Sequence, residues 1–249
     1  MIGAMDDRLP DGVVRVRADN PSPLTLDGTN SYVVEGWVVD PGPDDPRHLD
    51  AIVTAAGEGG IEGIVLTHSH VDHSEGAPAL ADRSGAQVVL PTGGEEVGPF
   101  EAIATPGHSH DHVSLLAGRL LFSGDTVLGA GSVFISPGEG SMAAYLDSLR
   151  RLRELDLEAI LPGHGPVVWQ PRSKLDQYIE HRLERERKIV AALGAGARTR
   201  DEVLDRAWDD VDFEALPFLR YAAGLTLDAH VEKLVEEGRL DEPPWRTSG

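Results

Sequence analysis

The segment Thr-His-Ser-His-Val-Asp-His, which runs from Thr67 to His73, packs three imidazoles and a carboxylate into six consecutive residues. It follows directly after the apolar segment 61–66, which predicts a buried strand. Neutral imidazole nitrogens and carboxylate oxygens are the ligands that borderline cations such as Zn²⁺ prefer, and a strand end can direct several of them to one point. The segment therefore predicts a metal site.

The spacing within this segment predicts room for two metals. His68 and His70 lie two residues apart and can point the same way, whereas Asp72 and His73 fall on the next turn and can face a second position. The alternative interpretations are a histidine-rich surface loop and core histidines held by hydrogen bonds. A metal site needs enough ligands as well as suitable ones, so further candidates in the chain decide between these interpretations.

Three such candidates lie at the ends of later apolar segments. His108 follows Thr-Pro-Gly, Asp125 follows Phe-Ser-Gly, and His164 follows Leu-Pro-Gly. Glycine and proline beside each of them indicate residues that are presented at the end of a strand. With these residues the chain has enough ligands for a metal centre.

Composition excludes several classes of protein. The chain has 249 residues, a formal net charge of −20 and no cysteine. Such a charge disfavours broad electrostatic binding to nucleic acid or anionic membranes, because both depend on clustered lysine and arginine. The lack of cysteine excludes disulfides, thiolate ligands and a cysteine nucleophile. Residues 1–8 lack the pattern of a signal peptide and no segment is long enough to span a bilayer, so we expect a cytoplasmic protein.

Hydrophobic periodicity predicts a mixed α/β architecture. Alternating or continuous apolar segments predict strands at 13–17, 30–34, 37–40, 61–66, 87–90, 100–104, 113–116, 119–122 and 158–161. Helical spacing predicts helices over 46–56 and 77–83 and from Ser141 onward. Strands mixed with helices, with polar residues collected at strand ends, imply sheets that pack on each other and are covered by helices.

The ligand pattern resembles a known family. The order of His68-x-His70-x-Asp72-His73, His108, Asp125 and His164 is similar to that of the metallo-β-lactamase superfamily, over about two thirds of the chain. The resemblance implies an αβ/βα sandwich with a dinuclear metal centre between its sheets. It also implies two ligand sets, with His68, His70 and His108 on the first metal, Asp72, His73 and His164 on the second, and Asp125 bridging.

Within that superfamily, two features narrow the resemblance. Asp125 is present, whereas true β-lactamases of this fold lack a bridging aspartate, and the 38 residues between Asp125 and His164 leave no room for the inserted domain of RNA-processing members. Segments 20–32, 105–112 and 178–182 look like the β-lactamase-like protein 2 family. That family includes a mitochondrial single-strand endoribonuclease and many bacterial proteins without an assigned substrate.

The C-terminal part has a different, helical character, which predicts a catalytic domain over 1–172 and a small helical domain over 173–249. Segment 173–193 is an amphipathic helix, Thr199-Arg200-Asp201-Glu202 is a capping box that opens a second helix, and Thr226 opens a third. Three helices and a short extended tail resemble a winged-helix module. Acidic residues outnumber basic ones from 226 to 241, so we expect this module to shape the rim of the site or a homodimer contact rather than to bind DNA.

The remaining polar residues give weaker predictions. Candidates for substrate contact or for support of the metal ligands are Asn30, His110, His112, His181 and Arg182. A local structural role is the alternative for each of them. We expect His48 and His230 to be surface or capping residues.

The chemistry expected from this ligand set is hydrolysis. Two cations about 3.5–4 Å apart can lower the pKa of a bridging water toward roughly 7 and so generate hydroxide at neutral pH. Asp72 would orient that water or carry its proton. Two zinc ions are the expected cofactor, although the same ligands also suit manganese or iron.

Three functional classes follow from these predictions. The first is a hydrolase of a small ester or thioester, which the acidic composition favours. The second is a single-strand endoribonuclease, for which a basic groove near Arg182, Arg185, Arg187 and Lys188 would be needed. The third is a non-catalytic metal-binding protein.

Overall fold

The structure is a computed structural model that describes residues 8–214, 217–242 and 245. By its internal contacts the chain divides into two compact units. Among the described residues, unit 1 holds 8–105, 111–133 and 153–174, and unit 2 holds 106–110, 134–152 and the residues from 175 onward. The domain boundary predicted at residue 172 stays a prediction. The expected absence of a signal peptide concerns mainly residues 1–7, which lie outside the described residues.

The first sheet of unit 1 has the strand order β1 (Val13–Arg17), β2 (Asn30–Val34), β3 (Trp37–Val39), β4 (Gly63–Val65) and β5 (Gln87–Val89). β1, β2 and β3 pair antiparallel, and β3, β4 and β5 pair parallel. Glu35 and Gly36 connect β2 to β3 with φ of 49° and 79°. Positive φ at both central residues is what a two-residue hairpin turn of type I′ requires, which confirms the predicted hairpin.

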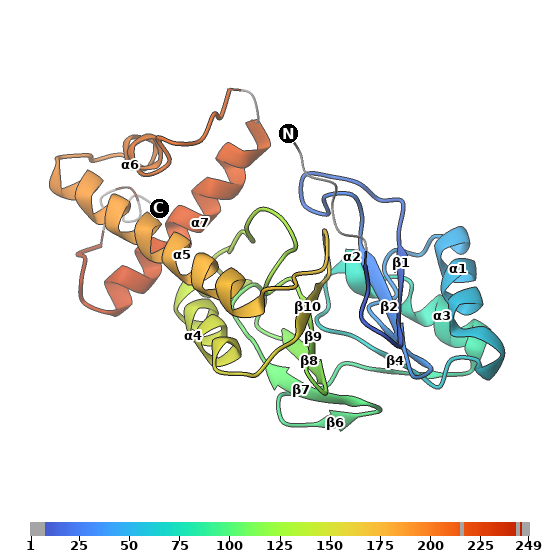
Figure 1. The fold of residues 1–249 in the computed structure, drawn as a ribbon. Helices are drawn as coiled ribbons and strands as arrows, with labels where there is room; N and C mark the ends of the chain where they lie inside the picture. Colours follow the sequence, from blue (N-terminus) through green and yellow to red (C-terminus); the bar gives the residue numbers. More distant parts are fainter. Residues whose placement is uncertain (1–7, 215–216, 243–244, 246–249) are drawn as a thin grey trace. The chain divides into compact units, whose positions relative to one another are not determined.

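Helices α1 (Pro46–Ala56) and α3 (Ala77–Ser84) cover one face of this sheet (Figure 1). Leu49 and Ile52 from α1 and Leu80 from α3 pack with Val38 and Ile64 of the strands, and all are fully buried. The Asp45 side chain accepts a hydrogen bond from the backbone N–H of Arg47 and so begins α1. A short 3-10 helix, η1 (Gly57–Gly59), follows α1.

The second sheet has the order β10 (Ala159–Pro162), β9 (Leu120–Gly124), β8 (Val113–Ala117), β7 (Phe100–Ala104) and β6 (Glu96–Val97). β10 pairs parallel with β9, and the other pairs are antiparallel. The short strand β6 is absent from the sequence-based prediction. The other nine strands correspond to predicted segments, within a few residues at their ends.

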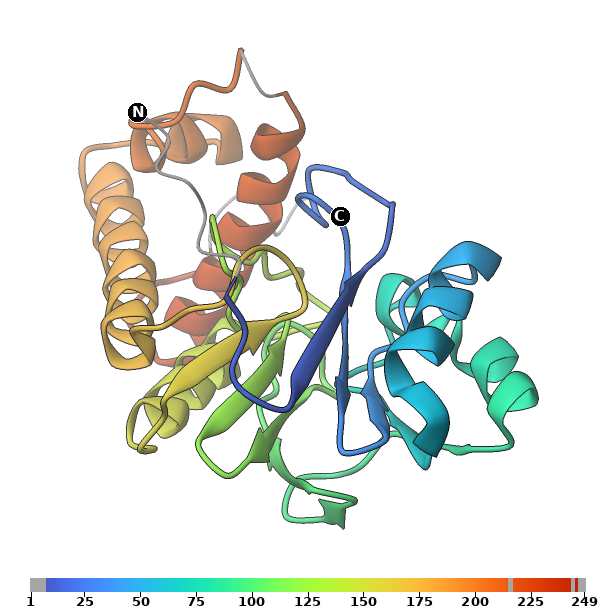
Figure 2. The same ribbon diagram turned by 45° about the vertical axis from the view of Figure 1, so that its right-hand side comes forward.

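The two sheets pack face to face around one apolar core (Figure 2). Tyr32 and Val65 from the first sheet meet Phe100, Phe122 and Leu161 from the second. The Tyr32 and Phe122 rings contact edge to face with centroids 5.3 Å apart, a favourable arrangement of aromatic quadrupoles. Mixed α/β with two packed sheets is thus the observed architecture, as predicted.

Unit 2 is helical and has its own core. It contains most of α4 (Met142–Arg153) and α5 (Pro171–Gly194), together with α6 (Arg200–Ala207) and α7 (Pro217–Glu236). Its apolar core joins α5, α6 and α7 through buried side chains such as Ile189, Leu204 and Leu227. None of the described helices is long and apolar enough to cross a membrane.

Two predictions for unit 2 have different outcomes. Thr199 caps α6, and the reciprocal bonds with Glu202 form the predicted capping box. The prediction that Thr226 opens a helix is wrong, because α7 begins nine residues earlier at Pro217. The Thr226 hydroxyl donates instead to the carbonyl of Ala222 within the helix, at 3.0 Å. The described residues after 174 contain no strand that could form the wing of a winged helix. The winged helix therefore stays a prediction.

Candidate metal centre

The histidine-rich segment leaves β4 and enters a one-turn helix, α2 (Val71–Ser74). Two side chains hold the connecting loop through its backbone. Asp40 accepts from the N–H of Thr67 at 2.7 Å, and Asp111 accepts from the N–H of Ser69 at 3.0 Å. The loop and the first turn of α2 therefore present their polar side chains from a fixed backbone.

Four side chains of unit 1 converge with their ligand atoms close together. The Nε2 atoms of His73 and His164 are 3.2 Å apart. Asp125 Oδ1 lies 3.4 Å from Nε2 of His73 and 3.3 Å from Nε2 of His164. Asp72 Oδ2 lies 3.7 Å and 3.2 Å from the same two nitrogens. These residues come from α2, from the end of β9 and from the end of β10, so both sheets contribute.

The distances suit a bound cation. Ligands placed about 2.0–2.1 Å from a tetrahedral metal lie about 3.3–3.4 Å from one another, since the edge of a tetrahedron is roughly 1.6 times its radius. The five separations given above, between 3.2 and 3.7 Å, match that edge. His68 also faces this cluster, because its ligand atom groups with those of His73 and Asp125 within 4.8 Å.

Asp40 prepares His73 for this role. Its Oδ2 lies 2.9 Å from Nδ1 of His73, and a carboxylate can only accept. Nδ1 therefore carries the proton, and Nε2, which points into the cluster, is the nitrogen whose lone pair can bind a cation. The backbone of Asp40 has φ of 48°, an uncommon conformation for a residue other than glycine, and the residue is 2% exposed.

The same carboxylate acts on His68 through Thr67. The Thr67 hydroxyl donates to Asp40 Oδ2 at 2.7 Å, so it can only accept from Nδ1 of His68, 3.0 Å away. This assigns the proton of His68 to Nδ1 as well. Sequence reasoning missed Asp40 and Thr67 as supporting residues. The available signal was an aspartate that follows the apolar β3 directly and precedes a proline.

The turn that carries His164 is fixed by Asn30. The side-chain amide of Asn30 donates to the carbonyls of Pro162 and Gly165, at 3.0 and 2.9 Å. A Cβ on Gly163 would lie 2.5 Å from Cε1 of His73 and 3.0 Å from Oδ1 of Asp125, so only glycine fits beside these side chains. Asn30, predicted near the site, thus supports the backbone on both sides of His164.

Electrostatics in the cluster favour a positive charge at its centre. Burial lowers the pKa of His73, but the charges of Asp125 and Asp40 outweigh burial and raise that pKa well above its usual value. Burial likewise opposes the charge of Asp125, yet His164 and His73 hold the pKa of Asp125 well below its usual range. The Asp125 and Asp72 carboxylates raise the pKa of His164 to about 9 against the effect of burial. Without a cation the carboxylates retain protons on the imidazoles, and a divalent cation would displace them.

Comparison with known proteins decides the family. The profile of the "Metallo-beta-lactamase superfamily" matches residues 24–99 and 90–164. The chain belongs to this superfamily. It is also 32% identical to a "Beta-lactamase-like protein 2 homolog" from Caenorhabditis elegans, over 97% of this chain and 90% of that protein. The predicted resemblance to both groups is confirmed.

Two further proteins extend the comparison. An "Atrochrysone carboxyl ACP thioesterase" from Aspergillus fumigatus is 32% identical over 75% of this chain and 66% of its own length. The crystal structure of a beta-lactamase domain protein from Burkholderia ambifaria superposes with a TM-score of 0.75, at 21% identity, over 94% of this chain and 88% of that one. The second likeness supports the metallo-β-lactamase fold.

The other histidines considered in the sequence of this superfamily member are divided between the two units. His108 belongs to segment 106–110 of unit 2, where its Nδ1 lies 3.3 Å from the carbonyl of Phe134, so its Nε2 is the nitrogen without a proton. His110 is exposed and His112 is buried in unit 1. The surface positions predicted for His48 and His230 are wrong, because these residues are 5% and 0% exposed and lie on the buried faces of α1 and α7.

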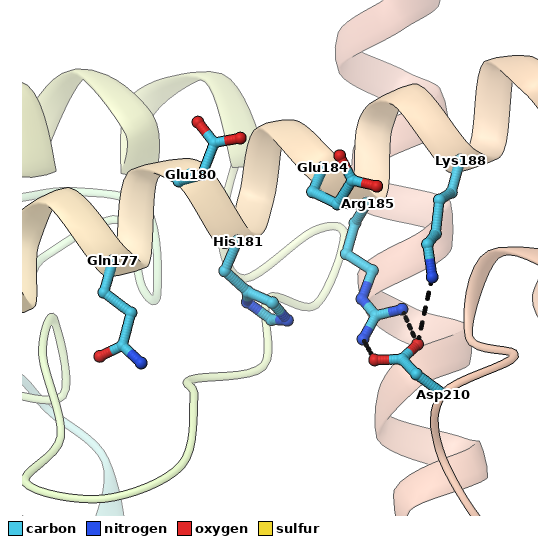
Figure 3. Close-up of a pocket in the computed structure, with 7 residues that line it drawn as sticks. All are labelled: Gln177, Glu180, His181, Glu184, Arg185, Lys188 and Asp210. Atoms are coloured by element: carbon cyan, nitrogen blue, oxygen red, sulfur yellow. Dashed lines mark hydrogen bonds and ion pairs between the residues drawn. The ribbon is translucent and has the colours of Figure 1, made fainter.

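His181 and Arg182 lie on α5 in unit 2. His181 lines a pocket of about 470 Å³ together with Gln177, Arg185 and Asp210, and Figure 3 shows these side chains on one side of α5. Burial, followed by the charges of Arg182 and Arg185, lowers the pKa of His181 to about 4. Arg182 is buried, with its guanidinium 5.3 Å from the centroid of the Tyr145 ring.

Proposed function

We propose that this protein is a hydrolase of small thioesters or esters that depends on two divalent cations, with zinc as the expected metal. The observation that carries the proposal is the convergence of His73, His164, Asp72 and Asp125 at tetrahedral spacing in a member of the metallo-β-lactamase superfamily. Superfamily members bind divalent metals through His and Asp side chains of this kind.

The proposed ligand sets follow the order of the motif. Asp72, His73 and His164 hold one cation, and Asp125 is shared between two. For the other cation we propose His68, His70 and His108, on the basis of the sequence order and of the protonation of Nδ1 in His68 and His108. Imidazole and carboxylate donors without thiolate suit zinc, manganese or iron.

When bound, two cations supply an acidic water and stabilise the negative charge that develops on the attacked carbonyl oxygen. The protein holds the reacting groups around them. Burial opposes the charge of Asp72, but without cations the hydrogen bond from His164 and the charge of His73 keep the pKa of Asp72 below its usual value. A bound cation would replace these positive charges and act in the same direction, so the carboxylate is ionised at neutral pH. The Asp72 side chain is 33% exposed, so it can reach solvent. We assign to it the orientation of the attacking water and the acceptance of its proton.

Substrate class is inferred from a relative and from charge. A thioesterase is among the similar proteins, at 32% identity. Three of the four basic side chains that an RNA groove would need already pair with carboxylates. Arg185 pairs with Asp210, Arg187 pairs with Glu180 and Glu184, and Lys188 pairs with Asp209. The fourth, Arg182, is buried. A small acyl thioester therefore fits this chain better than a polyanion does.

The experiment combines metal analysis with paired assays on one preparation. Elemental analysis gives the metals per chain, and hydrolysis of an acyl-N-acetylcysteamine thioester is compared with cleavage of a fluorescent single-stranded RNA. Asp125→Asn, which keeps the size of the side chain, tests the site. Asp50→Asn on the exposed face of α1 is the matched control for the same chemical change.

We expect the wild-type protein to bind two equivalents of metal and to hydrolyse the thioester until a chelator is added. We expect Asp125→Asn to lose metal and hydrolysis, and Asp50→Asn to keep both. RNA cleavage that is sensitive to salt and chelator would replace the thioester by RNA as the substrate class. Two bound metals without turnover of either substrate would favour a non-catalytic metal-binding protein. Turnover by a metal-free preparation would refute the mechanism.

A further inference from the structure

His112 is a buried imidazole in unit 1 with both ring nitrogens engaged. It lies between Thr105 at the end of β7 and Asp125 after β9, and it is 1% exposed. Its Nε2 accepts a hydrogen bond from the backbone N–H of Asp125 at 3.1 Å. Its Nδ1 lies 3.0 Å from the hydroxyl of Thr105 and 3.2 Å from that of Thr126. The ring therefore connects the residue that follows β7, Thr105, with the residue that follows β9, Asp125.

These partners fix the protonation of the ring. A backbone N–H can only donate, so Nε2 of His112 must be the acceptor and must carry no proton. In a neutral imidazole the proton then lies on Nδ1, which donates to one of the two threonine hydroxyls. The Thr105 hydroxyl is also 3.1 Å from that of Ser114, so hydroxyl groups extend the hydrogen-bond network from His112 to Ser114.

The space around this contact is tight. Gly124 has φ of 46°, and a Cβ there would lie 2.5 Å from the hydroxyl oxygen of Thr67 and 2.8 Å from Nε2 of His112. One face of the His112 ring stacks on the His68 ring, with centroids 4.7 Å apart and an angle of 30° between the ring planes. The peptide that leads into Asp125 is thus held between Thr67 and His112, and movement of His112 would move both His68 and Asp125.

We propose that His112 is a positioning residue that sets the place of the shared ligand Asp125 through the bond from the Asp125 N–H to Nε2, an inference that rests on the proposed function. The alternative is a core histidine that only fills space. The two roles differ in one respect, because positioning requires an acceptor at the place of Nε2, whereas filling space requires only volume.

Three substitutions separate these roles. The side-chain oxygen of His112→Gln lies as far from Cβ, in bonds, as Nε2 does, so it retains an acceptor for the Asp125 N–H. His112→Met has similar length and volume without that acceptor. His112→Asn retains a polar group near the place of Nδ1 and leaves the Asp125 N–H without its partner. Far-UV circular dichroism and thermal unfolding of each variant check that the fold is retained.

The readout is metal binding, not turnover. Competition with a chromophoric chelator gives the affinity for each cation, and the visible spectrum of the Co²⁺-loaded protein reports the ligand geometry. We expect His112→Gln to stay near the wild-type affinity. We expect His112→Met and His112→Asn to lose about 10–100-fold at one cation, as is typical when a partner of a metal ligand is removed, with an altered Co²⁺ spectrum.

The results can overturn the inference in more than one way. Equal affinity and spectra for Gln and Met at position 112 would show that only volume matters. If the Asn variant does not fold, the comparison of Gln with Met decides alone. If the wild-type protein itself binds no cation, the proposed function fails and with it this inference. Binding of both cations by the Met variant with the wild-type affinity would refute this inference alone and leave the proposed function in place.

Discussion

Both units bury charged side chains, but they satisfy them in different ways. In unit 2, Lys233 donates to Glu186 at 2.7 Å, and both are less than 10% exposed. Arg239 also pairs with Glu186, and Arg185 forms two hydrogen bonds with Asp210. In unit 1, His73 and His164 meet Asp72 and Asp125 with nitrogens and oxygens directed at one region.

The difference separates a structural ion pair from a binding site. The buried charges of Lys233, Glu186 and Arg185 in unit 2 each have an opposite charge within hydrogen-bond distance, so nothing further is needed to satisfy them. In unit 1, two imidazole nitrogens lie 3.2 Å apart with carboxylate oxygens of Asp72 and Asp125 beside them, which is the spacing of ligands around one cation. Charges that pair internally therefore need no ligand, whereas nitrogens and oxygens directed at one region are the arrangement on which we base the proposed metal site.

The largest effect should come from removing Asp125 of unit 1, the proposed shared ligand. Asp125→Asn keeps the volume but weakens the donor for both cations. We expect thioester turnover to fall by at least about a thousandfold, since a ligand should matter more than the roughly 10–100-fold of an outer hydrogen-bond partner. Steady-state kinetics and elemental analysis measure this change. Wild-type kcat in a folded variant would contradict it.

Breaking the buried pair of unit 2 should change stability instead. Lys233→Met leaves Glu186 buried with Arg239 as its remaining partner, and we expect a loss of about 3 kcal/mol in the free energy of unfolding. Urea denaturation followed by circular dichroism measures it. Metal affinity should stay unchanged, and the double variant Glu186→Gln/Lys233→Met should recover part of the loss. A weaker metal site in Lys233→Met would remove the contrast between the units.

Asp40→Asn should have a smaller effect on the site. Asparagine tolerates the positive φ of this position and keeps the size, but its amide cannot hold the proton on Nδ1 of His73 as a carboxylate does. We expect metal affinity to fall about 10–100-fold. Chelator competition measures the affinity. The thermal unfolding temperature of the metal-free variant serves as the control for a general loss of structure.

The smallest effect should be a pH dependence in unit 2. The pKa of His181 is lowered from 6.5 to about 4 in the folded state by burial and by Arg182 and Arg185, against the opposing charge of Asp210. Between these values the unfolded chain binds more protons than the folded chain, so stability is present above about pH 6.5 and is lost as the pH falls toward 4. Between pH 7 and 4, the urea concentration at the midpoint of unfolding of unit 2 should fall less steeply for His181→Gln than for the wild-type protein. Parallel slopes for the two proteins would contradict this.

The sequence predicted those parts of the site that lie in one segment or beside a local signal. His68, His70, Asp72 and His73 are nearly contiguous, and glycine marks the strand ends that precede Asp125 and His164. Their assignment as ligands stays a prediction. Nine of the strands and helices α1, α3, α4 and α5 followed from periodicity, because their apolar faces pack on a core.

Supporting residues were harder to predict because their partners are distant in the chain. Asp40 acts on His73 across 33 residues, and no local pattern links the two. Thr226 misled the prediction because threonine, typical of an N-cap, can also bond back to a carbonyl within a helix. Pro217 at the first turn was the better signal for the start of α7.

The origin of the clustered residues has a consequence for the lifetime of the protein. His73 follows β4 in one sheet, whereas Asp125 and His164 follow β9 and β10 in the other. A cation held by all three would link the two sheets, so unit 1 could not unfold without releasing it. At a free cation concentration of about 100 times Kd this linkage adds about 2.7 kcal/mol. Scarcity of metal in the cell would then expose unit 1 to proteases, and the amount of protein would follow the metal supply.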